Sequence, residues 1–492
     1  MKINIYRNRI LVLLLFACVY YYKKYKKNIL FFIYKNTSSG KKYLNSKKKE
    51  ALLTIKDKLF SKKYTYNFDT LPINGVHEED IKNILSNRKS IVGNKISGCV
   101  YSNNKYCESL VSYINSQYLY SNPLHPDIYP ELIKMESEII KMIGSLYDLP
   151  ASGGGNLTTG GTESTILALK AYKKLKKKYL PFFTPEVLCT KTVHAAVNKA
   201  CELLDLNIVY VNLDDNNVMD VIDLQNKISF KTCVIIGSAP CFAYGLMDPL
   251  VDISYIAESN NIPFHVDACL GGFLTQFDYN LKFTFDLNIQ SISVDPHKFG
   301  YAPKGSSILL WKEKTMKRNQ YFIVSDWTGG IYASVSLPGS RVGSQIATTW
   351  GSILYNGYQC YESISKKIIS ETIYLKHEIE KIDTFKVIGN PNVNVVAFYS
   401  TRYNVSQLID YLSKHDWNLN ILQNPLCIHI CITPKNIDNI ENLIDLLKNI
   451  LNEKIDESSS NIASIYGISA KIPDKSIIDG IVESYLDLTT SI

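Results

Sequence analysis

The middle of the chain, from about residue 150 to residue 311, alternates short apolar runs with longer amphipathic segments. The apolar runs are rich in β-branched residues, which is typical of buried strands, and segments such as His194–Asp205 and Val251–Ser259 have helical patterns. This alternation predicts a mostly parallel sheet covered by helices, whose ligand sites lie beyond the carboxyl ends of the strands. The expected strands are Glu186–Thr190, Ile208–Val211, Thr232–Gly237, Pro263–Asp267, Ile289–Asp295 and Ser306–Trp311.

The rest of the chain divides by the same criteria. After Arg341 the pattern is helical again, with Glu362–Ile382 expected to be one long helix, and a smaller α+β domain should follow. Residues 35 to about 90 are polar, lysine-rich and weakly patterned. We therefore expect an N-terminal membrane-anchor region at 1–34, a linker and N-terminal segment at 35–130, a large domain at 131–345 and a small C-terminal domain at 346–492.

The N-terminus carries one uncharged apolar run, Ile10–Tyr22, between basic flanks. Its 13 residues would rise about 20 Å as a helix, which is short of a hydrocarbon core of roughly 30 Å. The tyrosines and the following lysines can reach the membrane interface, and the excess of positive charge after the run places the body of the protein in the cytosol. A secretory signal peptide is the other interpretation, but no small-residue cleavage site precedes the lysines. We predict an uncleaved anchor.

Composition excludes several classes of protein. With 46% hydrophobic and 20% charged residues among 492, the chain is neither disordered nor a polytopic membrane protein. The net charge of +8 arises largely from lysine runs such as Lys23–Lys27 and Lys47–Lys49. These runs lack periodic aromatic interleaving, so they indicate a solvated or membrane-facing stretch and no nucleic-acid partner.

The 11 cysteines are odd in number and form no CxxC pair, which indicates a reducing compartment. Cys427, His429 and Cys431 would share one face of a strand, as metal ligands or as part of a half-buried strand. Because no fourth ligand is in sight, we predict the half-buried strand and no metal site.

The sharpest chemical signal is the segment Ser293–Gly300, which follows an expected strand. It places Lys298 behind His297 in a loop of small residues, where the amine can meet a cofactor aldehyde. Taken alone, this segment could also be a surface turn with a solvated lysine that has no catalytic role.

Three features upstream favour the cofactor interpretation. Asp267 ends an expected strand, where a carboxylate can keep the pyridine nitrogen of pyridoxal 5′-phosphate protonated and make the ring an electron sink. The segment Thr158–Ser164 runs through two glycines into a helix, an arrangement that binds phosphate. His194 opens the next helix and could stack on the ring. Each feature alone could be a cap or a turn, but their order, each at a strand end, predicts a pyridoxal-phosphate site.

These motifs resemble the sphingosine-1-phosphate lyase family, fold-type-I pyridoxal-phosphate enzymes allied to the group II amino-acid decarboxylases. The resemblance covers the chain from about Ser97 to the C-terminus and includes the arrangement of the N-terminal anchor. It implies a mostly parallel seven-stranded sheet in the large domain and a smaller C-terminal α+β domain. It also implies a homodimer with active sites at the subunit interface and a single-pass endoplasmic-reticulum anchor with a cytosolic catalytic domain. The stretches that carry it are Ser97–Ser102, Ser121–Asp127, Gly160–Ser164, His194–Ala196, His265–Phe273, Gly300–Ser307, Gly329–Ser334 and Gly339–Arg341.

The implied reaction is cleavage of the C2–C3 bond of sphingosine 1-phosphate, or of a related phosphorylated long-chain base, to a fatty aldehyde and phosphoethanolamine. The base for the C3 hydroxyl stays open among the cofactor phosphate, a water and Lys304. The expected site residues are Lys298, Asp267, His194 and Lys304 for catalysis, Gly160, Gly161, Thr162, His194, Asp267, His297 and Lys298 for the cofactor, and Tyr101, His125 and Lys304 for the substrate phosphate.

The sequence departs from the family pattern at Phe242–Gly245, where Phe-Pro-His-Gly is usual, and at Val342–Ser344, where Pro-Gly-Gly is usual. We expect Tyr244 to change a polar group near the cofactor. Two alternatives remain: a group II amino-acid decarboxylase, and a membrane-tethered scaffold that keeps the fold without turnover. The residues expected at a second phosphate favour the lyase over the decarboxylase, and the presence of Lys298 and Asp267 opposes the scaffold.

Overall fold

The computed structural model describes residues 93–453 without a break, most of 70–86, the helix at 476–490 and isolated positions between 37 and 53. The predicted anchor at residues 10–22 lies outside the described residues. Within the described part of the chain, no helix is both long and apolar enough to cross a membrane. Residues 92–422 and 427–455 form one compact unit, which holds the seven-stranded and four-stranded sheets. Helices α3 (Glu78–Ser86) and α16 (Ser476–Thr490) belong to the other unit.

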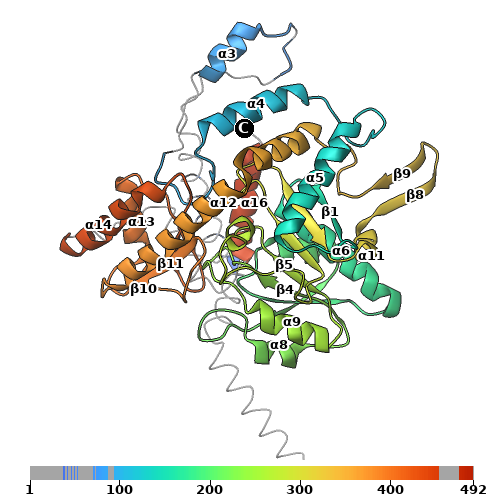
Figure 1. Ribbon diagram of the computed structural model, residues 1–492. Coiled ribbons are helices and arrows are strands. Elements are labelled where there is room, and N and C mark those ends of the chain that lie inside the picture. The colour runs from blue at the N-terminus through green and yellow to red at the C-terminus, as the bar shows by residue number, and fades with distance from the viewer. Residues whose placement is uncertain are drawn as a thin grey trace, which may run out of the picture. The chain divides into compact units, whose positions relative to one another are not determined.

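The large sheet has seven strands in the order β1-β7-β6-β5-β4-β2-β3, as Figure 1 shows in part. Neighbours from β3 through β6 are parallel, while β7 runs antiparallel to both β6 and β1. The predicted mostly parallel seven-stranded sheet is therefore confirmed. The strands are β1 (Gly154–Thr158), β2 (Glu186–Thr190), β3 (Asn207–Val211), β4 (Thr232–Ser238), β5 (Phe264–Asp267), β6 (Ser291–Val294) and β7 (Ser307–Trp311).

Helices pack on this sheet because the central strands are apolar on both faces, with every residue of β4, β5, β6 and β7 buried. On one side Leu167, Leu169 and Tyr172 of α6 join Val234 and Trp311 in a single core cluster. The helices of the large domain are α4 (Lys105–Gln117), α5 (Pro130–Leu146), α6 (Gly161–Tyr179), α7 (Ala196–Leu203), α8 (Val221–Lys227), α9 (Leu250–Ser259), α10 (Gly272–Thr275) and α11 (Lys314–Lys317), followed by a 3-10 turn at Arg318–Gln320.

The hairpin of β8 (Phe322–Trp327) and β9 (Gly330–Ser334) stands apart from the large sheet in Figure 1 and was missed by the sequence analysis. Its side chains are mostly exposed, so burial imposes no alternation on them. The predicted long helix at Glu362–Ile382 is the second half of α12 (Gly343–Glu380), which begins earlier and bends at Gly357, where φ is 63°.

The small domain is a four-stranded antiparallel sheet in the order β10-β11-β13-β12, with helices α13 and α14. The strand predicted around His429 is confirmed as β13, but its half-burial is wrong because all five of its residues are buried. His429 donates from Nδ1 to the Ala243 carbonyl (2.8 Å) and accepts at Nε2 from the Asn420 amide (3.0 Å). The elements are β10 (Phe385–Val387), β11 (Val395–Ser400), α13 (Val405–Lys414), β12 (Asn420–Leu422), β13 (Cys427–Cys431) and α14 (Ile440–Asn449), with 3-10 turns at Ile437–Asn439 and Ile450–Asn452.

Two glycines with positive φ, Gly245 and Gly330, allow a test of how closely the small domain packs on the large one. At Gly245 φ is +71°, and an added Cβ would lie 2.4 Å from the carbonyl oxygen of Val395 in β11. At Gly330 φ is +101°, but an added Cβ would meet nothing within 4 Å. Gly330→Ala should lower the free energy of unfolding by about 1–2 kcal/mol through backbone strain. Gly245→Ala should lower it by about 1–3 kcal/mol more through overpacking. Urea unfolding measures both, and equal losses would contradict the close approach.

Candidate active site

Two cavities meet at Lys298, at the carboxyl ends of the parallel strands. The glycine-loop cavity, of about 350 Å³, is lined by residues 159–163, His194, Phe242, Asp267 and both side chains of the His297–Lys298 pair. The tyrosine cavity, of about 230 Å³, is lined by residues 99–102, parts of α4 and residues 301–304, and again by His297 and Lys298. One amine is thus accessible from two chambers of different composition.

The floor of the glycine-loop cavity is the turn between β1 and α6. The first backbone N–H groups of α6 have no partners within the helix, and the helix dipole adds positive potential there. A Cβ on Gly161 would lie 2.7 Å from Cys269 Sγ, so this position accepts only glycine without rearrangement. Glu163 fixes the turn, because one carboxylate oxygen accepts from both the backbone N–H and the hydroxyl of Thr159 (2.7 Å each). The other oxygen accepts from the backbone N–H of Leu337 (2.8 Å). The turn is therefore a rigid cradle that suits an anion.

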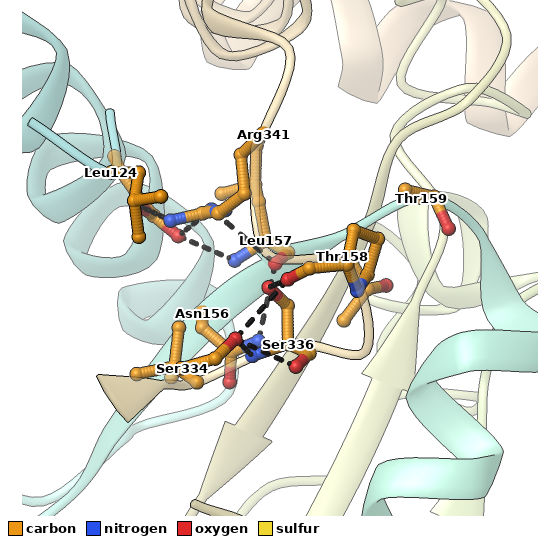
Figure 2. Close-up of polar contacts among 12 residues, drawn as sticks. Leu124, Asn156, Leu157, Thr158, Thr159, Ser334, Ser336 and Arg341 are labelled. Atoms are coloured by element: carbon orange, nitrogen blue, oxygen red, sulfur yellow. Dashed lines mark hydrogen bonds and ion pairs between the residues drawn. The ribbon is translucent and has the colours of Figure 1, made fainter. Parts of the chain in front are cut away.

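A second carboxylate holds the strand that leads into this turn. Glu136 of α5 forms a two-point ion pair with Arg341 (2.6 and 2.8 Å) and also accepts from the backbone N–H of Leu157 (2.9 Å). Asn156 and Leu157 are neighbours on β1. Figure 2 shows Arg341 beside Leu157, and Ser334 and Ser336 near Asn156. The segment after the β8–β9 hairpin is thus joined to β1 through Arg341, which contacts Leu157 directly and shares Glu136 with it.

Asp267 lies at the end of β5, and its Oδ1 accepts from the Cys269 N–H (3.1 Å) and the Ser293 hydroxyl (3.3 Å). The parallel register pairs Asp267 with Ser293 of β6. His265, two residues earlier, contacts the hydroxyls of Ser291 (2.7 Å) and Ser293 (3.3 Å). Burial lowers the pKa of His265 to about 4, although Asp267 opposes the shift, so the ring is neutral at pH 7. Asp267 is therefore held in one orientation at the cavity wall.

Lys298 points to a carboxylate that the sequence analysis did not select, Asp295. Its Nζ lies 2.9 Å from Asp295 Oδ2, and His297 Nε2 lies 3.5 Å from the same oxygen. Burial would lower the pKa of Lys298, but the charge of Asp295 outweighs it and raises that pKa above its usual value. Asp295 stands only three residues before Lys298, and a turn with a hydrogen bond from the Lys298 N–H to the Asp295 carbonyl (3.0 Å) brings the two side chains together.

His194 lies on the cavity wall at the start of α7 and is exposed. Its Nδ1 accepts from the backbone N–H of Ala196 (3.1 Å), which leaves the ring proton of the neutral form on Nε2. Phe242 approaches it edge to face at 6.4 Å between ring centroids. The imidazole is thus oriented by its own helix and by an aromatic neighbour.

Of the three residues expected at a substrate phosphate, the structure brings two together. The Lys304 ammonium lies 4.5 Å from the centre of the buried Tyr101 ring, which packs edge to face on Phe299. Burial lowers the pKa of Lys304 and raises that of Tyr101. His125 is exposed in the loop before α5 and lines neither cavity of its own protomer.

The expectation for Tyr244 is wrong. Tyr244 is 3% exposed and packs with Cys241, Leu246, Ala397 and Cys427 in a core cluster shared with the small domain, so it lines neither cavity. Burial raises its pKa to about 12. Tyr244 therefore packs between the two domains and not on the wall of either cavity.

Comparison with known proteins gives the same picture across most of the chain. Residues 76–401 match the family model of the pyridoxal-dependent decarboxylase conserved domain. The sphingosine-1-phosphate lyase of Dictyostelium discoideum is 37% identical over 85% of this chain and 81% of its own length. Sphingosine-1-phosphate lyase 1 of Rattus norvegicus is 36% identical over 85% of this chain and 76% of its own length.

Solved structures agree on the fold. The sphingosine-1-phosphate lyase of Burkholderia pseudomallei K96243 is 27% identical, with a TM-score of 0.75 over 79% of this chain and 93% of that one. A glutamate decarboxylase of Lactobacillus brevis is 20% identical, with a TM-score of 0.71 over 82% of this chain and 98% of that one.

The ion pair below the glycine turn gives a prediction about stability. Arg341→Met removes the cation that binds both oxygens of the buried Glu136 carboxylate, while Lys317, the other cation nearby, donates to the Gly155 carbonyl; this should lower the free energy of unfolding by about 3–5 kcal/mol. Adding Glu136→Gln should recover part of that loss. The control is the exposed Lys134–Glu138 pair on the same helix, where Lys134→Met should cost less than about 1 kcal/mol. Similar urea midpoints for Arg341→Met and Lys134→Met would contradict a structural role for this pair.

Proposed function

The chain belongs to the sphingosine-1-phosphate lyase family of pyridoxal-dependent enzymes, and we propose that it cleaves the C2–C3 bond of sphingosine 1-phosphate or a related phosphorylated long-chain base. The products are a fatty aldehyde and phosphoethanolamine. The observation that carries the proposal is the position of Lys298 between a cavity with an anion cradle and a cavity with Tyr101 and Lys304. Decarboxylation, the alternative reaction, finds support only in the wider superfamily.

Pyridoxal 5′-phosphate is the cofactor, and the residues of the glycine-loop cavity fit it. The turn at Gly160, Gly161 and Thr162 would hold its phosphate, since it opens a helix and is kept close against Cys269 and Asp295, where a side chain at Gly161 would collide. Asp267 would face the ring nitrogen and His194 the ring surface, while Lys298 would bind the aldehyde carbon. When bound, the cofactor supplies an electron sink for the pair released by the breaking bond.

The chain's own residues then have separate tasks. Asp267, held by Ser293 and the Cys269 N–H, keeps a proton on the ring nitrogen. In the tyrosine cavity, Lys304 and Tyr101 offer a cation and a hydroxyl to the substrate phosphate. Alternatively, Lys304 in its neutral form is a candidate base for the C3 hydroxyl, because its lowered pKa eases loss of the proton; the cofactor phosphate and a water are the other candidates.

His125 suits a homodimer in which it reaches the site of a second copy. It lies on an exposed loop between α4 and α5, outside both cavities of its own chain. Large apolar side chains are exposed on α4, on the loop that carries His125 and on the first half of α12. Among them are Tyr113, Tyr120, Ile128 and Tyr358, each more than half exposed. Burial of such a surface against a second copy would complete the phosphate pocket.

The remaining proposals concern location. We place the N-terminal run Ile10–Tyr22 in the endoplasmic-reticulum membrane as an uncleaved anchor, with the catalytic domain in the cytosol. Its basic flanks and the membrane origin of long-chain bases support this assignment.

Replacement of the lysine tests the chemistry. Lys298→Ala should lose turnover and the yellow chromophore, because no other amine lies at the junction of the two cavities among the described residues. Borohydride treatment of wild-type protein should fix the cofactor on Lys298, as read by peptide mass spectrometry. Lys304→Ala, the matched control, should keep the chromophore. Cofactor fixed on another lysine would contradict the assignment.

Substrate class is tested through the second phosphate. A charge-assisted hydrogen bond contributes about 1.5–3 kcal/mol, so His125→Ala should reduce kcat/KM for a phosphorylated long-chain base about ten- to a hundredfold. Cofactor occupancy, read by absorbance, should stay unchanged. Equal cleavage of the unphosphorylated base by wild-type protein, or carbon dioxide release from amino acids, would favour the decarboxylase.

A further inference from the structure

Asp295 lies between two side chains that can each carry a positive charge. Its carboxylate is 2% exposed, and its Oδ2 contacts Lys298 Nζ at 2.9 Å and His297 Nε2 at 3.5 Å. Within the described part of the chain, neither Asp295 Oδ1 nor His297 Nδ1 has a hydrogen-bond partner. One buried anion therefore has two basic neighbours and incomplete hydrogen bonding.

Because Asp295 is buried beside the glycine turn, the number of its two neighbours that carry a positive charge affects stability. A Cβ on Gly161 would lie 3.1 and 3.2 Å from the two Asp295 oxygens, so the carboxylate lies directly against the glycine turn. A buried anion without a cation is costly, and so are two buried cations on one anion. The favourable state has one positive partner for Asp295. The other titratable groups coupled to this trio are Cys269, Tyr101, Cys431 and Lys304, while Asp267 acts on Cys269.

We propose that Asp295 is a shared counter-ion that holds Lys298 as an ammonium before cofactor binding and pairs with a protonated His297 once the lysine amine has left it. This rests on the proposed function, because it assumes that Lys298 is the cofactor lysine. Asp295 is in this sense a positioning residue that acts through its two neighbours.

The exchange conserves charge. Before it, the trio holds one anion, one ammonium and one neutral imidazole. After it, the ammonium of Lys298 has lost one proton and the imidazole of His297 has gained one, so the sum stays at zero. The His297 ring also faces the glycine turn, with Cε1 3.9 Å from the position of a Cβ on Gly160, so an anion in the cradle favours the protonated ring.

Hydrogen–deuterium exchange at histidine C2, followed by mass spectrometry across a pH series, reports the pKa of each histidine in the full-length protein. In the wild-type protein, burial lowers the pKa of His297 below its usual value. The positive charge of Lys298 lowers it further, whereas the negative charge of Asp295 opposes the shift. Lys298→Met should raise it by about one unit, a tenfold change in proton affinity, because Asp295 then has only His297. Lys304→Met, which removes a less strongly coupled cation, should raise it less, and exposed His377 serves as an internal reference.

The second measurement follows the lysine. In cofactor-free protein, competitive labelling with acetic anhydride should modify Lys298 only at high pH, and Asp295→Asn should shift half-labelling to lower pH by at least one unit. Pyridoxal phosphate should then load onto Asp295→Asn about tenfold faster at pH 7 than onto wild-type protein.

If the pKa of His297 is unchanged in Lys298→Met, Asp295 does not pass from Lys298 to His297. If the pH profile of Lys298 labelling is unchanged in Asp295→Asn, Asp295 does not hold Lys298 as an ammonium. The Lys298→Met result stands even where Asp295→Asn fails to fold. Failure of the proposed function is distinguishable, because borohydride would then fix the cofactor elsewhere while the histidine and lysine readouts remain measurable without it.

Discussion

The carboxylate of Glu136 is the interaction on which the geometry of this site depends. It joins three segments far apart in the sequence: α5, the end of β1 and the segment that follows the β8–β9 hairpin. A backbone N–H on an edge strand and a guanidinium on a loop are both satisfied by one buried group. Since β1 passes directly into the glycine turn, the position of the anion cradle is set by this contact as much as by the turn itself.

The parallel strands supply the second constraint. Asp267 ends strand β5 and Asp295 follows the adjacent strand β6, so the parallel pairing brings two carboxylates to one edge of the sheet. The two carboxylates differ in their hydrogen-bonding and charged partners. Hydroxyl and N–H donors hold Asp267, whereas basic side chains face Asp295. One sheet edge thereby presents a carboxylate for a ring nitrogen and another for an amine.

Sequence pattern predicted six of the seven strands of the large sheet to within a residue or two, because most of them are buried and read as continuous apolar runs. It did not predict β1, whose sequence Gly-Gly-Asn-Leu-Thr has no apolar run. It missed the β8–β9 hairpin, whose exposed side chains carry no such pattern.

Sequence pattern misplaced Tyr244 because in a loop the direction of a side chain follows from local backbone geometry, which periodicity does not report. In this loop Phe242 faces the cavity instead. Asp295 was overlooked although it stands three residues from the lysine, since its role follows from a turn and not from a motif. The position of His125 relative to the site depends on assembly and lies beyond any pattern in one chain.

The bend in α12 has an evolutionary consequence. The helix contacts α4 and α5 before the bend and the small-domain strands β10 and β11 after it, so one continuous segment links both domains. At Gly357 the backbone has φ of 63° and ψ of 174°, a region that is essentially restricted to glycine. An added Cβ there would meet nothing within 4 Å, so backbone torsion alone, and not crowding, restricts the residue. Missense changes at the first or second base of a glycine codon replace glycine with a residue that has a side chain, and such alleles would alter the angle between two domains while every catalytic side chain remained intact.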